Sequence, residues 1–180
     1  DRDGDSATSP LTITVDGNGD GVAQINGTSG DDHLVGGSLA DLITGFAGAD
    51  TFIGQGGDDE ITLGVDASTN DNASDTVIIG VGDGVDTIYG FDISGSSTTP
   101  GTGDILDLSE LFSGGDEILS LQFGDLTGDS TDDVEISVNG SPVAILDGAT
   151  LFNGAGAADL VALQSDPTEI ENSIVTSALV

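Results

Sequence analysis

The clearest pattern along the chain is an apolar residue that returns every nine positions between residues 27 and 62. These apolar residues are Leu34, Ile43, Phe52 and Ile61. Each is the middle of a three-residue segment that follows six residues rich in glycine and aspartate. A short strand of this kind points its central side chain to an interior. The pattern predicts four short strands joined by tight turns, with two nonapeptides in each coil of a β-solenoid.

The polar segments place glycine and aspartate at fixed positions of the nonapeptide. Glycine is first, as Gly27, Gly36, Gly45 and Gly54, and it is also fourth in three repeats, as Gly30, Gly48 and Gly57. Aspartate is sixth, as Asp32, Asp41, Asp50 and Asp59. Glycine tolerates positive φ and a close approach of the backbone, so these turns can curl their carbonyl oxygens inward. Because aspartate adds the hard anionic oxygen that Ca²⁺ prefers, we predict that these residues bind several calcium ions.

These nonapeptides resemble the repeats of the RTX family, whose consensus is G-G-x-G-x-D-x-U-x with U apolar. The resemblance implies a parallel β-roll in which calcium lies between successive turns on the same side. Asp32 would then share an ion with Asp50, and Asp41 with Asp59. Stacked strands lie about 4.8 Å apart, so two such carboxylates would repel by about 3 kcal/mol at an effective dielectric of ~20. We therefore expect the stack to come apart without the cation.

The repeats depart from this consensus at two positions. The second position is glycine only at Gly37 and is otherwise Thr28, Phe46 and Gln55, and the fourth position of the second repeat is Leu39. Leu39 makes the Asp41/Asp59 site the less regular of the two. Because terminal repeats of a solenoid cannot bury their faces alone, four repeats also need flanking structure.

The charge of the chain points to the same ligand. It carries 33 acidic residues and one basic residue, Arg2, which gives a formal net charge of −32 and opposes collapse. A lone arginine cannot bind phosphates, so nucleic acid and anionic membranes are poor partners, whereas a multivalent cation fits. Intrinsic disorder is the alternative that this composition allows. A salt-adapted surface would scatter its carboxylates without phase, and these carboxylates have one.

The repeat pattern continues in a degenerate form after residue 62. The segment 81–89 places Asp86 and Ile88 at the sixth and eighth positions, and Asp75 begins another unit with a damaged turn. Asp83, Asp86 and Asp75 are therefore further candidate ligands. Strands are predicted at 118–123, 134–138 and 142–148, and short helices at the end of 103–112 and over 157–164. The expected fold is an all-β parallel β-roll that continues into an irregular β-rich region with one or two short helices.

Two later segments, DTIYGF (86–91) and GDILDLSELF (103–112), resemble the C-terminal target region of type I secreted proteins and RTX adhesins. The resemblance implies export by the type I machinery, with residues 165–180 in an uncleaved secretion signal. A frayed or strand-forming terminus is the alternative for this tail. Residues 1–15 resemble the last strand of an adhesin extender repeat, and a chain that begins at Asp1 suggests a fragment of a longer protein. We expect a linker at 1–25, the roll at 26–64, a β-rich cap at 65–164 and the tail at 165–180.

Two other acidic loops have partial metal-ligand spacing. Asp16, Asn18 and Asp20 open an EF-hand-type loop, but its twelfth position is Gly27 instead of glutamate. Asp125, Asp129 and Asp133 have alternate-ligand spacing, but Ile136 stands where glutamate is needed. A solvated turn is an equal or better interpretation of both loops.

Catalytic motifs are missing from the sequence. Neither H-E-x-x-H nor G-x-S-x-G occurs, and the single histidine, His33, lies at an outward position where we expect it to be solvated. Cysteine is absent, and no apolar run is long enough for a membrane span. The prediction is a non-enzymatic, monomeric calcium-binding module of a secreted adhesin at the bacterial cell surface, whose parent binds an unknown surface ligand. The alternatives are the tail of a secreted hydrolase, or a module that recognises carbohydrate or ice.

Overall fold

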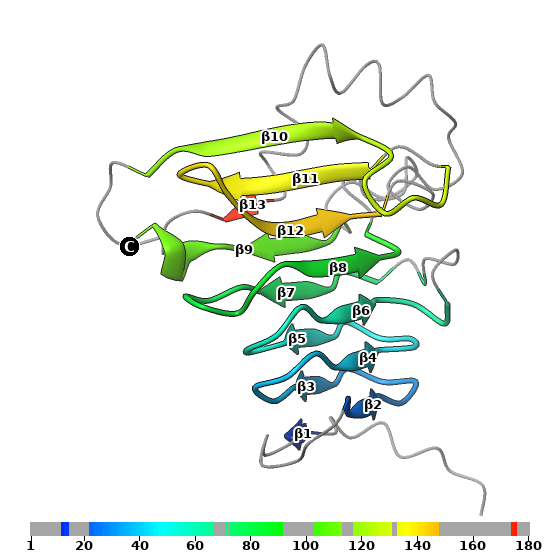
Figure 1. Cartoon of the computed structure of the whole chain (residues 1–180). Coiled ribbons are helices and arrows are strands. Elements are labelled where there is room, and N and C mark those ends of the chain that lie inside the picture. The colour runs from blue at the N-terminus through cyan, green and yellow to red at the C-terminus, as the bar shows by residue number, and fades with distance from the viewer. Residues whose placement is uncertain are drawn as a thin grey trace, which may run out of the picture.

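The computed structural model describes residues 12–14, 22–66, 71, 73–91, 103–112, 117–130, 133–147 and 174–175. Within them the chain winds as a solenoid with two facing sheets (Figure 1). The first sheet consists of β1 (Thr12–Thr14), β3 (His33–Val35), β5 (Thr51–Ile53), β7 (Thr76–Ile78), β9 (Ile105–Asp107) and β13 (Ile174–Val175). The second consists of β2 (Gln24–Asn26), β4 (Leu42–Thr44), β6 (Glu60–Thr62), β8 (Asp86–Tyr89), β12 (Ser141–Leu146), β11 (Asp133–Val138) and β10 (Leu119–Gly124).

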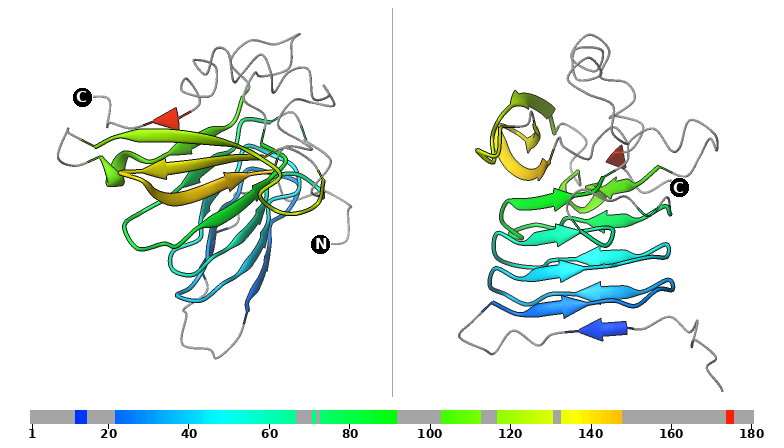
Figure 2. Two further views of the ribbon diagram at one scale, coloured as in Figure 1. Left: turned by 45° about the horizontal axis from the view of Figure 1, so that its top comes forward. Right: turned by 90° about the vertical axis from the view of Figure 1, so that its right-hand side faces the viewer.

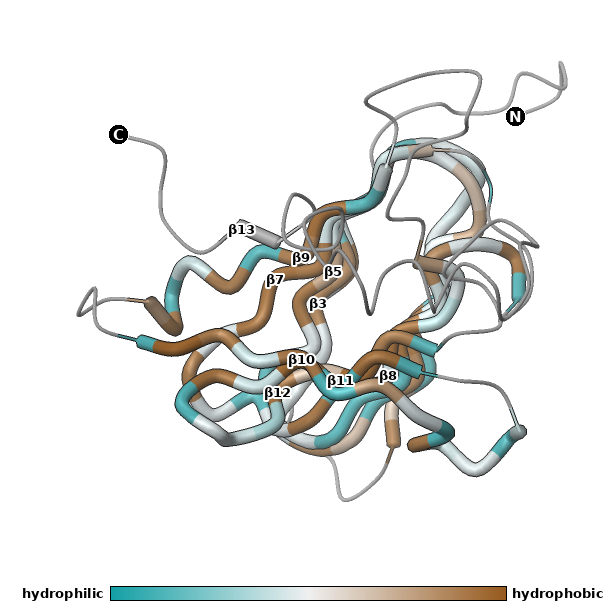
Figure 3. Tube along the Cα trace, turned by 90° about the horizontal axis from the view of Figure 1, so that it is seen from above, coloured by the Kyte–Doolittle hydropathy of each residue, from teal (hydrophilic) through white to brown (hydrophobic). Residues whose placement is uncertain are grey.

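Parallel pairing between coils explains the nine-residue period. His33 of β3 pairs with Thr51 of β5, and Leu42 of β4 pairs with Glu60 of β6. Each pairing spans two nonapeptides, so one coil takes 18 residues. The strands of each sheet consequently lie over one another when the stack is viewed from above (Figure 3). The predicted parallel β-roll is confirmed.

The roll continues beyond the four regular repeats because longer turns keep the strands in register. Thr51 of β5 pairs with Thr76 of β7, and Glu60 of β6 pairs with Thr87 of β8. The extra residues of these coils lie in the turns, so the stacking of the strands is unchanged. At the other end, β1 pairs in parallel with β3 and adds a strand below the first repeat (Figure 2).

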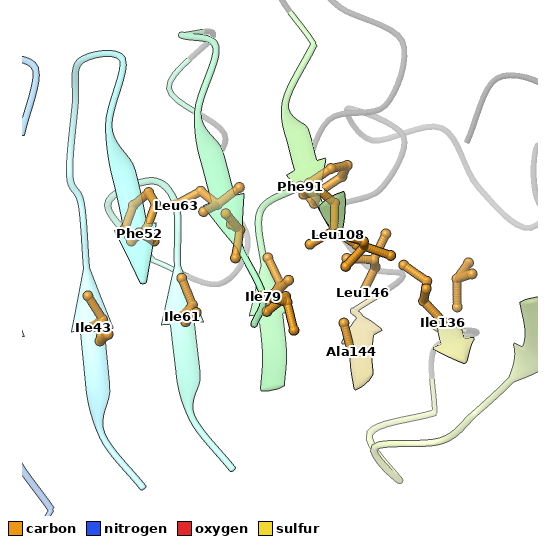
Figure 4. Packing of buried hydrophobic residues seen from close by; sticks show 14 of the residues in the cluster. Ile43, Phe52, Ile61, Leu63, Ile79, Phe91, Leu108, Ile136, Ala144 and Leu146 are labelled. Atoms are coloured by element: carbon orange, nitrogen blue, oxygen red, sulfur yellow. The ribbon is translucent and has the colours of Figure 1, made fainter. Parts of the chain in front are cut away.

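The core is a double row of side chains between the two sheets (Figure 4). The eighth residue of each nonapeptide points inward, and Leu34, Ile43, Phe52 and Ile61 are at most 1% exposed. Later coils supply matching residues, which are Val77, Ile88 and Leu106. Each coil thus adds apolar area to one continuous core, which is why successive coils stabilise one another.

An antiparallel unit, β10–β11–β12, extends the second sheet beyond β8. Strand β12 pairs in parallel with β8, whereas β11 pairs antiparallel with both β12 and β10. Asn139 and Gly140 connect β11 to β12, and both have positive φ, 54° and 77°. This is the Asn-Gly signature of a two-residue hairpin. The inner faces of these strands, with Ile136 and Leu146 fully buried, close the end of the core.

The strands predicted at 118–123, 134–138 and 142–148 correspond to β10, β11 and β12. The only helical segment in the described part of the chain is a 3-10 turn, Ser109–Leu111, directly after β9. The helix predicted at 157–164 lies outside the described residues, as does the 165–180 tail except for β13. None of the described helical structure is long and apolar enough to cross a membrane.

Candidate metal centre

Two columns of buried aspartates run along the roll, each at the start of its strands. The first column consists of Asp32, Asp50, Asp75 and Asp104, and the second consists of Asp41, Asp59 and Asp86. All seven are at most 4% exposed. Because the sixth residue of every nonapeptide directly precedes a strand, the stacking of the strands brings these carboxylates into line.

Hydrogen bonds connect the aspartates of neighbouring coils within each column. In the first column the backbone N–H of Asp32 donates to Oδ1 of Asp50 at 2.8 Å, and the N–H of Asp50 donates to Oδ1 of Asp75 at 2.8 Å. In the second column the corresponding bonds join Asp41 to Asp59 at 2.7 Å and Asp59 to Asp86 at 3.0 Å. One oxygen of each of these four accepting carboxylates therefore fixes the spacing between two coils.

The second oxygen of three of these carboxylates is buried without a hydrogen bond. The Oδ2 atoms of Asp50, Asp59 and Asp86 have no partner within the described residues. Burying a polar oxygen without a partner is costly, and burying a charged one costs more. A bound cation would remove this cost, so these three atoms mark where an ion fits.

The space beside these oxygens is lined by further oxygens and admits only glycine. A Cβ atom at Gly27 would lie 2.8 Å from Oδ2 of Asp32 and 2.5 Å from the carbonyl oxygen of Gly45, one coil away. At Gly45 it would overlap Oδ2 of Asp50 and lie 2.9 Å from the carbonyl oxygen of Leu63. Carboxylate and carbonyl oxygens are the ligands that Ca²⁺ takes in proteins. The first glycine of the repeat keeps that space open.

The turns differ in the hydrogen bonds that they make to Oδ2 of their aspartate. In the first two turns the backbone N–H of the second residue donates to Oδ2 of the same turn's aspartate, from Thr28 to Asp32 at 2.5 Å and from Gly37 to Asp41 at 2.6 Å. The third and fourth turns instead hold their second residue in the left-handed region, Phe46 at φ 78° and Gln55 at φ 67°. The turns with the left-handed residue are those whose Oδ2 is unpartnered.

Burial raises the pKa of four of the column carboxyls when no cation is bound. It raises the pKa of Asp50 to about 7, of Asp59 to about 6, of Asp75 to about 9 and of Asp86 to about 8. The hydrogen bond from the preceding level opposes this increase, and neighbouring carboxylates add to it. The columns hold carboxylates that ionise reluctantly unless a positive charge lies beside them.

Residues 26–61 match the family model of the RTX calcium-binding nonapeptide repeat in four copies. This segment consists of RTX calcium-binding repeats. Such repeats bind Ca²⁺ and are typical of secreted bacterial proteins, and the two aspartate columns suit this metal. A search of curated proteins found no match to the chain.

The structure brings the predicted pairs together in both columns. Asp32 lies next to Asp50 and Asp41 next to Asp59, and the same backbone-to-carboxylate hydrogen bond joins each pair. The outer parts of the turns differ, because the N–H of Ala49 donates to Asp31 in the first pair and that of Gly56 to the carbonyl of Gly37 in the second. Leu39 takes no left-handed conformation, and neither does Gly30 at the same position of the first repeat. Sequence reasoning missed Asp104, although Asp104-Ile105-Leu106 has the same aspartate-to-apolar spacing as the repeats.

The other predicted loops have different outcomes. Asp16, Asn18 and Asp20 lie outside the described residues. Asp129 and Asp133 lie with Asp147 so that one carboxylate oxygen of each falls within 4.8 Å of the others, but Asp125 instead accepts a bond from the N–H of Gly128. Asp147 had no sequence signal, because only the pairing of β12 with β11 and β8 places it there. Calcium binding at this loop stays a prediction.

His33 differs from its expected environment. It faces outward from β3 but is only partly exposed, and its Nδ1 atom is buried without a hydrogen-bond partner in the described structure. The expectation of a solvated histidine was therefore wrong, because the stacked neighbours Thr12 and Thr51 lie on either side of it in the sheet.

Proposed function

We propose that this chain is the calcium-gated module of a secreted bacterial adhesin, which folds outside the cell when Ca²⁺ binds. The observation that carries the proposal is the set of buried Oδ2 atoms without partners on Asp50, Asp59 and Asp86. A chain with 33 acidic residues and a single basic residue cannot neutralise them itself. Metal binding and folding are then one equilibrium, stabilised by mass action.

Calcium concentration would set where this folding happens. Extracellular calcium modules bind with dissociation constants of about 10⁻⁴ to 10⁻³ M, far above free cytosolic calcium. The chain would stay unfolded inside the cell, which suits passage through a type I exporter. Outside, the ions would fill the columns and the roll would form.

The adhesin context is supported by the resemblance of residues 86–91 and 103–112 to the target region of type I substrates. On this proposal, residues 165–180 carry the secretion signal, the parent protein binds a surface ligand, and the module is a non-catalytic monomer. A tail of a secreted hydrolase would use the same calcium chemistry, and a catalytic motif upstream of these residues would identify it.

Circular dichroism during a calcium titration tests the folding step. We expect little β-structure in chelator, a cooperative gain with Ca²⁺, and no comparable gain with the same concentration of Mg²⁺, which demands a stricter octahedral geometry. Replacing Asp32, Asp41, Asp50 and Asp59 together by asparagine should abolish the gain. Equal folding in chelator and in calcium would overturn the proposal.

Secretion of the chain from a type I-competent cell tests its second part. Deleting residues 165–180 should retain the protein inside the cell, whereas the quadruple asparagine variant should still be exported because its residues 165–180 are intact. Normal export of the truncated chain would remove the secretion signal from the proposal without affecting the calcium step.

A further inference from the structure

The turn at residues 81–86, beyond the matched repeats, has the backbone conformation of the third and fourth turns. Its second and fourth residues are left-handed, Gly82 at φ 90° and Gly84 at φ 105°. The fourth repeat has the same pair, Gln55 at 67° and Gly57 at 116°. The two turns therefore share their left-handed positions, although Val81 stands where the repeats have their first glycine and the connection between β7 and β8 is longer than those of the repeats.

The contacts between this turn and the turn at 54–59 repeat those between the third and first turns. The N–H of Asp59 donates to Oδ1 of Asp86 at 3.0 Å, as that of Asp32 does to Asp50. At the outer rim the N–H of Val85 donates to Oδ1 of Asp58 at 2.9 Å. The equivalent bond from Ala49 to Asp31 measures 3.0 Å. The two turns are therefore docked as a regular repeat pair is.

The carboxylate of Asp86 also has the feature that marks an ion position in the repeats. Asp86 is fully buried, and its Oδ2 atom has no hydrogen-bond partner within the described structure. Asp83 lies in the same turn, and its Oδ2 atom accepts the N–H of Gly80 at 2.5 Å.

The first column lacks these features in the same coil. The segment before Asp75 contains no glycine, and the carboxylate of Asp71 accepts the N–H of Gly48 at 2.9 Å and that of Ala73 at 2.9 Å. Within the described residues, the buried oxygens without a hydrogen-bond partner do not include Oδ2 of Asp75. The first column therefore does not show this mark of an ion position in the same coil.

We propose that the turns at 54–59 and 81–86 form an additional calcium site between the fourth RTX repeat and the turn that follows the matched repeats, with Asp59 and Asp86 as its carboxylate ligands. The calcium sites are consequently arranged asymmetrically, because they extend one coil further along the second column than along the first. The site rests on the calcium binding of the repeats. It adds an ion that joins them to the antiparallel unit β10–β11–β12, because β8 also pairs with β12.

Calcium stoichiometry of the full chain, by equilibrium dialysis with metal analysis, tests the site. Asp86→Asn keeps the shape of the side chain and an oxygen that can accept the bond from Asp59, but it removes the charge. We expect this variant to bind one Ca²⁺ fewer than the wild type, with circular dichroism confirming that it is folded. Asp75→Asn, at the same level of the other column, should bind as many ions as the wild type.

A second pair of variants keeps every carboxylate, in case Asp86→Asn fails to fold. Gly82 and Gly140 are both left-handed, and a Cβ atom at either would meet nothing within 4 Å. Gly82→Ala should weaken the binding of one Ca²⁺ by about tenfold. Gly140→Ala, in the hairpin between β11 and β12, should leave calcium affinity unchanged. Equal affinities in these two variants, or an unchanged ion count in folded Asp86→Asn, would overturn this site while leaving calcium binding by the repeats intact. A wild-type chain that binds no calcium would overturn both.

Discussion

Oδ1 of Asp59 accepts a hydrogen bond of 2.7 Å from the backbone N–H of Asp41, one coil earlier, while Oδ2 of the same carboxylate is buried without a partner in the described structure. One side chain thus sets the distance between two coils and offers a ligand to an ion. Loss of its charge and loss of its hydrogen bond are separable, because asparagine removes the first and can keep the second.

Asp59→Asn should therefore act in opposite directions with and without calcium. With calcium it should raise the concentration needed for folding by about tenfold or more, since a charged ligand is lost. In chelator it should favour the folded state slightly, because a buried charge no longer opposes it. Calcium titrations followed by circular dichroism measure both effects.

Asp58→Asn is the matched control for this prediction. Asp58 precedes Asp59 directly and also accepts a backbone N–H, from Val85 at 2.9 Å, but its side chain is exposed. Its replacement should change the free energy of unfolding by no more than about 0.5 kcal/mol. Equal shifts in the two variants would contradict a ligand role for Asp59.

The first glycine of the third repeat should not tolerate alanine. In Gly45→Ala the new methyl would overlap Oδ2 of Asp50 and lie 2.6 Å from Cζ of Phe52. We expect the free energy of unfolding in calcium to fall by about 1–3 kcal/mol, as in other overpacked sites. Gly56→Ala in the next turn places its methyl at an ordinary 3.5 Å from Ser38, so this control should be neutral or slightly stabilising. Urea unfolding at saturating calcium distinguishes the two.

Restoring the consensus glycine should help only where the backbone is left-handed. Gln55 is exposed and has φ 67°, so Gln55→Gly should stabilise the folded state by about 0.5–1 kcal/mol. Thr28 occupies the same repeat position without a positive φ, and its hydroxyl donates to Oδ2 of Asp32 at 3.0 Å. Thr28→Gly should therefore destabilise the protein by about 1 kcal/mol. Thermal unfolding in calcium should move in opposite directions for the two variants.

Much of the roll could be predicted from the sequence because its determinants are local. The apolar eighth residue and the aspartate at the sixth position define the coil, and they also located Asp75 and Asp86 after the regular repeats. Gln55 shows the limit of this reasoning, because a substituted consensus glycine hid the fact that the left-handed turn is retained.

The antiparallel unit β10–β11–β12 could be predicted only in part. Its three strands follow from apolar alternation, and the Asn139-Gly140 dipeptide indicates the hairpin between two of them. Their place in the fold depends on the pairing of Ala144 with Asp86, residues far apart in the sequence with no local signal for each other. The grouping of Asp147 with Asp129 and Asp133 follows from that pairing, so sequence spacing could not reveal it.

The pH dependence of the calcium-free chain should be the reverse of ordinary acid denaturation. The folded state raises the pKa of Asp59 to about 6, of Asp50 to about 7, of Asp86 to about 8 and of Asp75 to about 9. In the unfolded chain these carboxyls titrate near pH 3.9. Between about pH 4 and 9 the folded state consequently binds more protons than the unfolded state, so the free energy of unfolding falls as pH rises.

Calcium-free protein should therefore contain more β-structure at pH 5 than at pH 8, measured by circular dichroism in metal-depleted buffer. Calcium binding should instead be favoured by higher pH, since Ca²⁺ binds the ionised carboxylates and must displace their protons. The calcium concentration at the midpoint of folding should therefore rise as pH falls from 8 to 6. Replacing Asp50, Asp59, Asp75 and Asp86 together by asparagine should remove most of the pH dependence of the calcium-free form. If the metal-free wild type is equally unfolded at pH 5 and pH 8, the cost of ionising these carboxylates is not what keeps the roll from forming without calcium.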